Sequence, residues 1–382
     1  MVINKNPYHV QLLDKTGHVI TQHNGDGEKT STHWGYDGAD VQSVSDSWTA
    51  APDERIEGFG ERYNQLNQLG KTVTNYVYNQ YRDQGAAERT YLSAPFYRSS
   101  AGYGLYVNST ATTVFDVSNA GQNAVSFRTE TQDAHSLDYY LFTGTPERIL
   151  DNYTSVVGRP KLPPKWAFGV WMSANEWNTQ AEVENELANA QQYAIPHTAM
   201  VLEQWSDEAT FYTWHGAQYQ PKSGSDAPSY DDFTFPADGE WTDPKAMVDT
   251  VHDHGMKLVL WQIPVLKQNF DTNPSTAPQQ HVNDREYAAS QGYVVKNSDG
   301  TPYRIPENQW FGNSMVPDFT NPSATRWWMN KRAYLVDELG IDGFKTDGGE
   351  VIFGRNTRFS DGSNGMTMHN GYPQAYTSAY SS

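Results

Sequence analysis

Short apolar runs alternate with amphipathic segments along the second half of the chain, and this alternation restricts the fold more than any other feature. Parallel sheets are covered by helices on both faces, so their strands read as near-continuous apolar runs between helices. Four runs fit this description: Trp166–Ser173, Ala199–Gln204, Lys257–Ile263 and Gly343–Thr346. The pattern predicts an α/β domain whose four parallel strands neighbour one another in this order.

The segments between these runs carry helix start and stop signals. Asn178–Tyr193 opens with an Asn-Thr pair, and either residue is suited to cap a helix. Asp243–Gly255 begins with Asp-Pro and ends with glycine. Asn321–Gly340 has the same plan, with Asn before the proline. We therefore predict one helix in each segment.

The two longest connections, Ser206–Thr242 and Val265–Phe319, both follow a strand rather than a helix. In a (β/α)8 barrel, the loops after the strands build the active site. We therefore predict a partial barrel of this type, with its chemistry at the strand ends. Polar or aromatic residues are expected there: Trp171, Glu203, Trp261, Gln262 and Asp347. Lys345 precedes Asp347 by two residues, so both side chains face the same way and the cation favours a charged carboxylate.

Residues 1 to about 142 have a different pattern of short β-branched and aromatic runs separated by Gly, Asn and Asp. Such spacing is typical of a β-sandwich. A long polar stretch, Asn75–Thr90, is expected to be a loop. Thr145 then opens a helix with proline at its first position. Three prolines in Arg159–Lys165 mark a linker, so we predict a β-sandwich over residues 1–158 and the first half of a barrel over 159–382.

The composition excludes several functions. A net charge of −18 opposes binding to nucleic acid or to an anionic membrane. Cysteine is absent and the first residues are polar, which favours a cytoplasmic location. His252-Asp253-His254 is the one tempting metal cluster, but it lies at a predicted helix C-terminus, where such residues are common. We expect no metal and no cofactor.

Six motifs, in the right order, resemble those of glycoside hydrolase family 31, the α-glucosidase and α-xylosidase family. They are GFGERYNQL (58–66), APFYRSSAGYGLYVNS (94–109), PPKWAFGVWMS (163–173), DFTNPSATRWW (318–328), DGFKTDGGE (342–350) and MHNGYP (368–373). The resemblance implies a retaining α-glycoside hydrolase, most like an α-glucosidase, that acts on α-linked oligosaccharides through a covalent glycosyl-enzyme intermediate. It implies Asp347 as nucleophile, with Glu350 as a supporting acid. Trp171, Glu203, Trp261, Lys345 and His369 would bind substrate.

The sequence also departs from the family pattern. Glu203 stands where an aspartate is usual, and TDGGE replaces the commoner DMNE ending. The family's acid/base aspartate lies farther beyond the nucleophile than this chain extends. We therefore expect the chain to be an internal fragment, inactive by itself, of a longer enzyme.

Other functions stay open at this point. Within the family, an α-xylosidase, an α-galactosidase and an α-transglucosylase share the same nucleophile arrangement. A metal-dependent barrel enzyme and a non-catalytic carbohydrate-binding protein are alternatives from other classes. The sequence does not specify the sugar, the linkage or the oligomeric state.

Overall fold

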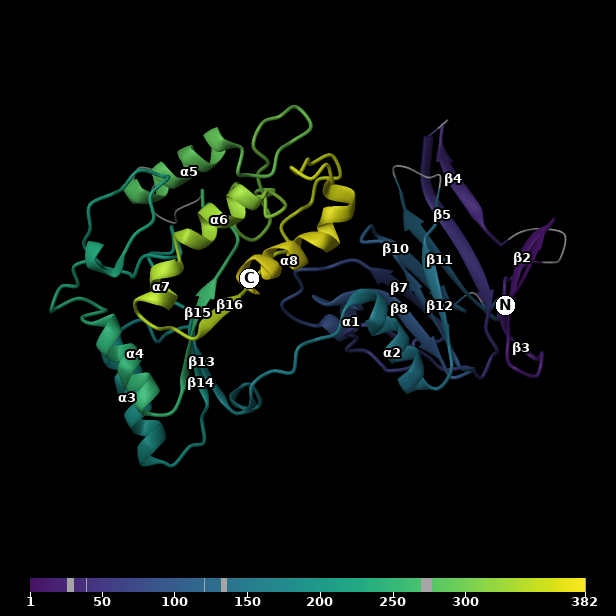
Figure 1. Ribbon diagram of the computed structural model, residues 1–382, viewed down its shortest axis with the longest axis horizontal. Helices are drawn as coiled ribbons and strands as arrows, with labels where there is room; N and C mark the ends of the chain where they lie inside the picture. The colour runs from purple at the N-terminus through teal and green to yellow at the C-terminus, as the bar shows by residue number, and fades with distance from the viewer. Residues whose placement is uncertain (26–30, 39, 120, 132–135, 269–276, 382) are drawn as a thin grey trace. The chain divides into compact units, whose positions relative to one another are not determined.

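The computed structural model describes residues 1–25, 31–38, 40–119, 121–131, 136–268 and 277–381. The chain forms two compact units (Figure 1). The first comprises Met1–Pro160 together with Gly365–Gly371, and the second comprises Lys161–Asn364 together with Tyr372–Ser382.

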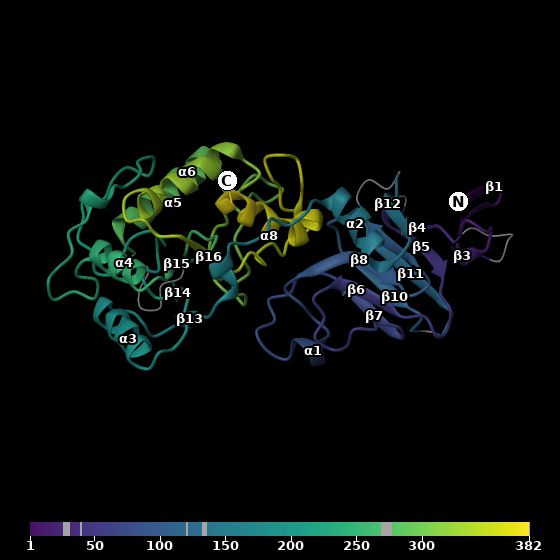
Figure 2. The same ribbon diagram turned by 60° about the horizontal axis from the view of Figure 1, so that its bottom comes forward.

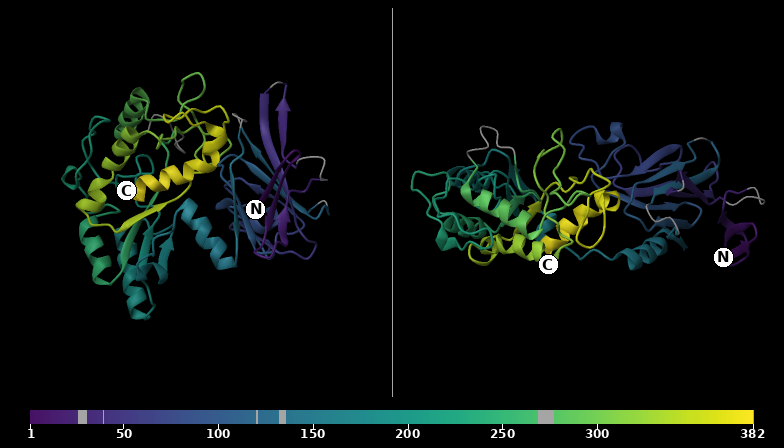
Figure 3. Two further views of the ribbon diagram at one scale, coloured as in Figure 1. Left: turned by 45° about the vertical axis from the view of Figure 1, so that its right-hand side comes forward. Right: turned by 90° about the horizontal axis from the view of Figure 1, so that it is seen from above.

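The first unit is built from antiparallel sheets, as the sequence predicted. Figures 2 and 3 show its strands in purple to blue. A five-stranded sheet has the order β4-β5-β11-β10-β7 and a four-stranded sheet has the order β12-β9-β8-β6, while β1-β2-β3 form a third sheet. The strands are β1 Val2–Lys5, β2 Tyr8–Leu13, β3 Val19–Gln22, β4 His33–Asp37, β5 Asp40–Thr49, β6 Ile56–Gly60, β7 Lys71–Asn75, β8 Ser93–Ser99, β9 Tyr103–Val107, β10 Thr113–Val117, β11 Ala124–Glu130 and β12 Tyr139–Thr143.

Alternating side chains of the two larger sheets form the core of this unit. Phe115 on β10 is fully buried, and its ring lies 5.0 Å from that of Phe59 and 5.9 Å from that of Phe127. Helix α2, Pro146–Val157, begins as predicted, since the Thr145 side chain accepts a hydrogen bond from the Arg148 N–H. The stretch expected to be a loop contains one helical turn, α1, Gln84–Ala87.

The second unit contains the predicted parallel sheet, in the order β13-β14-β15-β16. Its strands are β13 Trp171–Ala174, β14 Ala199–Leu202, β15 Lys257–Gln262 and β16 Gly343–Thr346. Helices α3, Gln180–Gln192, and α4, Pro244–Asp253, pack against each other, and α4 also packs on β15 (Figure 1). Their predicted caps are present, because the side chains of Thr179 and Asp243 accept hydrogen bonds from Glu182 N and Ala246 N.

The first predicted strand starts later than expected. Lys165–Phe168 forms a 3-10 helix, η1, and β13 begins only at Trp171. The Trp166 carbonyl oxygen accepts a hydrogen bond from Gly169 N, which closes this turn, and another from the Thr198 hydroxyl. A short apolar run carries no periodicity that separates a strand from such a turn.

The predicted helix Asn321–Gly340 is two helices, α6 Pro322–Asn330 and α7 Ala333–Asp337. At the junction, two adjacent cations are both buried. Lys331 pairs with Asp284 at 2.8 Å, whereas Arg332 donates a 2.6 Å hydrogen bond to the Gln262 side chain. Neighbouring residues of a regular helix point about 100° apart, so the break lets both side chains reach their partners.

The two long insertions differ in content. The first holds only a 3-10 turn, η2, Tyr230–Asp232. The second contains helix α5, Gln279–Gln291, which the sequence did not predict, and its residues 269–276 lie outside the described part of the chain. Helix α8, Gly365–Ser381, ends the chain. Across the described residues, no helix is both long and apolar enough to span a bilayer.

Replacing Phe115 by alanine should destabilise the sandwich by about 3–5 kcal/mol, because it removes a fully buried ring and leaves a cavity. Val114→Ala on the same strand is the matched control, since Val114 faces outward and is only partly buried. Urea unfolding monitored by circular dichroism measures both changes. Equal losses for the two variants would contradict the assignment of Phe115 to the core.

Candidate active site

The carboxyl ends of three parallel strands bring four polar or aromatic side chains together. In the register of the sheet, Leu202 of β14 lies opposite Leu260 of β15, and Gln262 lies opposite Thr346 of β16. The residues that follow or end these strands therefore meet at one edge of the sheet. They are Glu203, Trp261, Lys345 and Asp347, and hydrogen bonds or ion pairs connect all four.

Asp347 is held through its backbone and through both carboxylate oxygens. Its N–H donates to the Gln262 carbonyl at 2.9 Å. Oδ1 accepts a 2.8 Å hydrogen bond from Gly348 N, and Oδ2 accepts one of 2.8 Å from the Trp261 indole. The side chain is 39% exposed, so a carboxylate of fixed orientation remains accessible to a ligand.

Lys345 lies between two carboxylates. Its Nζ is 2.7 Å from Oε1 of Glu203 and 4.0 Å from Oδ2 of Asp347. The same oxygen of Glu203 accepts a 3.2 Å hydrogen bond from the Ser173 hydroxyl, at the end of β13. This arrangement offers a charged donor and a charged acceptor side by side, which suits vicinal hydroxyl groups.

The turn after Asp347 requires glycine. Gly348 has φ +71°, and a Cβ there would lie 2.6 Å from Cδ1 of Ile263 and 3.4 Å from the Trp310 ring. The absence of a side chain thus lets Ile263 pack against this turn, and the Trp310 ring lies within contact distance of it. The Trp310 ring lies 6.4 Å from that of Trp261 and is 44% exposed, so it forms an apolar wall of the site.

Sequence reasoning missed Trp310. The only sequence signal for Trp310 was its large aromatic side chain, and the second insertion contains several other aromatic residues. Trp261, which we expected to bind substrate, is only 8% exposed, and its indole N–H binds Asp347. Trp261 therefore orients the carboxylate, whereas Trp310 offers the more open ring.

Glu350 lies close to Asp347 and is partly buried. Burial raises the pKa of the Glu350 carboxyl to about 7, and the charge of Asp347 adds to the rise, whereas a backbone hydrogen bond opposes it. Glu350 is therefore protonated in the fold under mildly acidic conditions. A neutral carboxylic acid can donate a hydrogen bond, which the supporting role predicted from sequence requires.

Trp171 lies away from the other predicted residues. It is the first residue of β13 and pairs with Ala199, the first residue of β14, so it stands at the opposite end of the sheet from Asp347. Its indole N–H donates to the Ala167 carbonyl, and its ring packs 5.4 Å from that of Trp166. These contacts occur because β13 starts at Trp171 instead of ending there.

His369 belongs to the first unit. Its ring stacks on Tyr76 with centroids 3.7 Å apart, and its Nε2 lies 2.8 Å from the Val77 carbonyl oxygen. These contacts give His369 a packing function in that unit. Substrate binding by His369 stays a prediction.

The contacts of the His252-Asp253-His254 cluster involve Asp342. His252 lies 2.8 Å from Asp342, which also pairs with Lys257. Across the described ranges of the chain, no group of three or more His, Cys, Asp or Glu side chains is placed to hold a metal ion.

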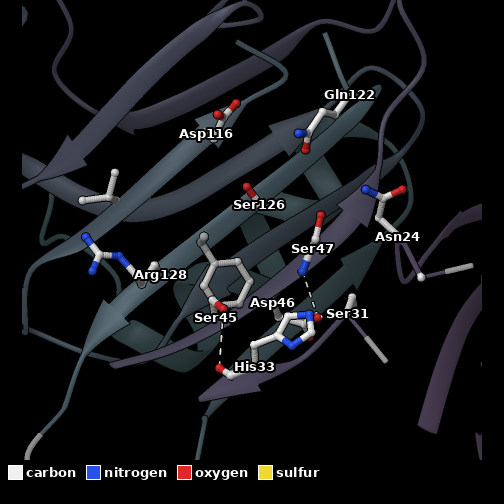
Figure 4. Close-up of a pocket in the computed structure, with 13 residues that line it drawn as sticks. Asn24, Ser31, His33, Ser45, Asp46, Ser47, Asp116, Gln122, Ser126 and Arg128 are labelled. Carbon is white, nitrogen blue, oxygen red and sulfur yellow. Dashed lines mark hydrogen bonds between the residues drawn. The ribbon is translucent and has the colours of Figure 1, made fainter. Parts of the chain in front are cut away.

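A separate hollow of about 570 Å³ lies on the outer face of the five-stranded sheet in the first unit (Figure 4). Its lining is mostly polar and includes Ser45, Asp116, Ser126 and Arg128. Phe127, the one phenylalanine that lines it, is 1% exposed, and the imidazole of His33 is the exposed ring there. None of the predicted site residues lines this hollow.

A β-sandwich followed by a parallel strand-helix unit, with an accessible carboxylate at the strand ends, defines the glycoside hydrolase class. The chain belongs to glycosyl hydrolase family 31. Residues 160–382 match the family's TIM-barrel domain, and residues 1–116 match its N-terminal galactose mutarotase-like domain. The resemblance seen in the sequence is thereby confirmed.

Three relatives cover nearly the whole chain. An isomaltosyltransferase of Sporosarcina globispora is 46% identical over 99% of this chain. The cycloalternan-forming enzyme of Listeria monocytogenes, solved with a pentasaccharide substrate, is 47% identical with a TM-score of 0.93 over 99% of this chain. The cycloalternan-degrading enzyme of Trueperella pyogenes, solved with a covalent intermediate, is 34% identical with a TM-score of 0.87 over 98%. The chain spans 34%, 35% and 54% of these proteins respectively.

The raised pKa of Glu350 predicts a pH dependence of stability. The protonated form is favoured in the fold, so its contribution is complete below pH 4.5 and is lost as the pH rises through about 7. Glu350→Gln keeps the neutral form at every pH. The variant should therefore lose less stability than the unmodified protein between pH 5 and pH 8, measured by urea unfolding. Identical pH profiles would show that Glu350 does not titrate in this range.

Proposed function

We propose that the protein carrying this chain is a retaining enzyme that cleaves α-glycosidic bonds in α-linked oligosaccharides, with Asp347 as the nucleophile. The observation that carries this proposal is the fixed, accessible carboxylate of Asp347 at the end of β16, bound by the Trp261 indole and next to Lys345. Family membership supports the same assignment.

The contacts of the site suit a two-step displacement. Asp347 attacks the anomeric carbon, the bond to the leaving oxygen breaks, and a covalent glycosyl ester forms. A second acid protonates the leaving oxygen, and we assign no residue of this chain to that role. Water or a sugar hydroxyl then attacks the anomeric carbon, releases Asp347 and restores the original configuration. Lys345 and Glu203 hold sugar hydroxyls, and Trp310 supports the apolar face of the ring.

An isomaltosyl group is the donor we favour. The relatives named above include an isomaltosyltransferase and two enzymes that form or degrade cycloalternan. This choice refines the α-glucosidase type predicted from the sequence, since an isomaltosyl donor still presents an α-linked glucosyl unit to the nucleophile. An α-xylosidase, an α-galactosidase or another α-transglucosylase of the family is the alternative. The cytoplasmic location stays a prediction from the lack of cysteine.

Asp347→Asn in the full-length protein should lower kcat by several orders of magnitude with little change in substrate binding. The amide has nearly the size of the carboxylate but is a far weaker nucleophile, so the covalent intermediate cannot form. Steady-state kinetics with an aryl α-glycoside measures this loss. Asp337→Asn is the matched control, because Asp337 is exposed and lies outside the site.

Labelling with a 5-fluoro glycosyl fluoride identifies the nucleophile directly. The added mass should fall on Asp347 in the tryptic peptide, as located by tandem mass spectrometry. A label on Glu350 or Glu203, or full activity of Asp347→Asn, would contradict the assignment of Asp347 as the nucleophile. Neither label nor turnover in the unmodified full-length protein would favour a non-catalytic carbohydrate-binding role.

A panel of aryl glycosides tests the choice of sugar. An aryl α-isomaltoside should show the highest kcat/KM, followed by the α-glucoside, with the α-xyloside and α-galactoside lower, because a donor of two glucose units adds binding contacts beyond the reacting ring. A faster reaction with the α-xyloside than with both glucose-based substrates would make the protein an α-xylosidase instead.

A further inference from the structure

A groove of about 620 Å³ lies within the second unit, between the first long insertion (Ser206–Thr242) and helix α4. One side is formed by the segment Tyr230–Phe235 and the other by residues of α4 and the segment just before it. None of the residues discussed for the Asp347 site lines it, and every residue of the groove lies in the described part of the chain.

Two stacked rings form the aromatic side of the groove. The centroids of Tyr230 and Phe235 are 5.6 Å apart with an interplanar angle of 27°, and both rings are partly exposed. The Tyr230 backbone N–H donates a 2.9 Å hydrogen bond to Glu338. Phe233, between them in sequence, is 9% exposed and packs 5.3 Å from Tyr334. The partly exposed rings are therefore anchored from below and keep a fixed orientation.

The facing side of the groove is polar. Lys245 and Asp249 lie one turn apart on α4 and are both exposed. The Lys245 ammonium stands 6.0 Å from the centre of the Tyr230 ring. The Asp249 carboxylate makes no hydrogen bond or ion pair with any residue that the structure describes. Thr234 adds an exposed hydroxyl at the aromatic side.

We propose that this groove binds a glucosyl segment of an α-linked oligosaccharide, as a secondary site separate from the one at Asp347. Pyranose rings combine an apolar face with hydroxyl edges, and the groove offers ring surfaces next to a carboxylate, an ammonium and a hydroxyl. The choice of a glucose-based ligand rests on the proposed function.

Two comparisons favour a neutral saccharide over other ligands. An anionic ligand would meet Asp243 and Asp249, both exposed in the groove lining, on a chain of net charge −18. The hollow of Figure 4 also has polar walls, but its phenylalanine is closed to a ligand and the single imidazole of His33 is its exposed ring. The groove at α4 instead offers a stacked pair of partly exposed six-membered rings next to polar groups.

The test uses the full-length protein with its reaction site blocked by the 5-fluoro glycosyl label. Isothermal titration calorimetry then measures the binding of linear α-linked gluco-oligosaccharides of increasing length. The blocked protein should still bind the longer oligosaccharides. Asp249→Ala and Tyr230→Ala should each weaken this binding, the latter roughly tenfold, as expected for losing an aromatic contact of about 1.4 kcal/mol. Asp231→Ala is the matched control, because Asp231 is exposed in the same turn but does not line the groove.

Thermal unfolding establishes whether Tyr230→Ala keeps the fold, and Asp249→Ala tests the groove without removing any packed ring. Turnover of a short aryl glycoside should be the same in both variants as in the unmodified protein. Loss of all oligosaccharide binding on blocking, or unchanged affinity in both variants, would overturn the proposal. If the label fails to attach, the proposed nucleophile is wrong, and the loss of oligosaccharide affinity caused by Tyr230→Ala and Asp249→Ala in the unlabelled protein tests the groove independently.

Discussion

The site depends on the hydrogen bonds of one buried residue, Gln262. It is fully buried at the end of β15, and its amide nitrogen donates a 2.7 Å hydrogen bond to the Phe211 carbonyl in the first insertion. Its oxygen accepts hydrogen bonds from Arg332 at 2.6 Å and from the Tyr380 hydroxyl at 2.9 Å. The backbone oxygen of the same residue accepts the N–H of Asp347. Through its side chain and its backbone carbonyl, Gln262 thus ties together an insertion, the α6–α7 junction, α8 and the backbone of Asp347. Because buried polar groups are costly when unpaired, these partners order one another.

Burial of Glu350, in addition to ion pairing with Lys345, keeps the negative charge of the site low. Two acids, Glu203 and Asp347, lie within 4.0 Å of one cation, Lys345. The raised pKa of Glu350 leaves that carboxyl neutral below about pH 7, so Glu350 adds no negative charge beside Asp347 there. The pairs are partly exposed, and their contribution to stability is therefore small. Their value lies in presenting donors and acceptors of fixed geometry to a polyol.

Sequence reasoning reached the features that have a local or periodic signal. The four parallel strands, their order and the caps at Thr179 and Asp243 follow from apolar runs and short cap motifs. The convergence of Glu203, Lys345 and Asp347 follows from the geometry of a parallel sheet, in which strand ends share one edge.

The features that sequence reasoning missed depend on contacts between distant residues. The break between α6 and α7 exists because Lys331 and Arg332 need separate buried partners, and neither partner is near in sequence. Trp310 reaches the site from the second insertion, through contacts with the distant residues Trp261 and Gly348. Trp171 was placed at the wrong end of its strand because the run before it reads equally well as strand or as helical turn.

The hydrogen bond from Trp261 to Asp347 makes the two carboxylate oxygens inequivalent, since each receives a different donor. Donation to a carboxylate withdraws electron density, which slows its attack on carbon but improves it as a leaving group. In the proposed reaction the same indole would therefore oppose the first half-reaction and assist the second. A shorter-lived ester leaves less time for an acceptor sugar to arrive before water does. A change in the strength of this one indole hydrogen bond could thus shift the ratio of sugar transfer to hydrolysis. The residues that hold the sugar would not have to change.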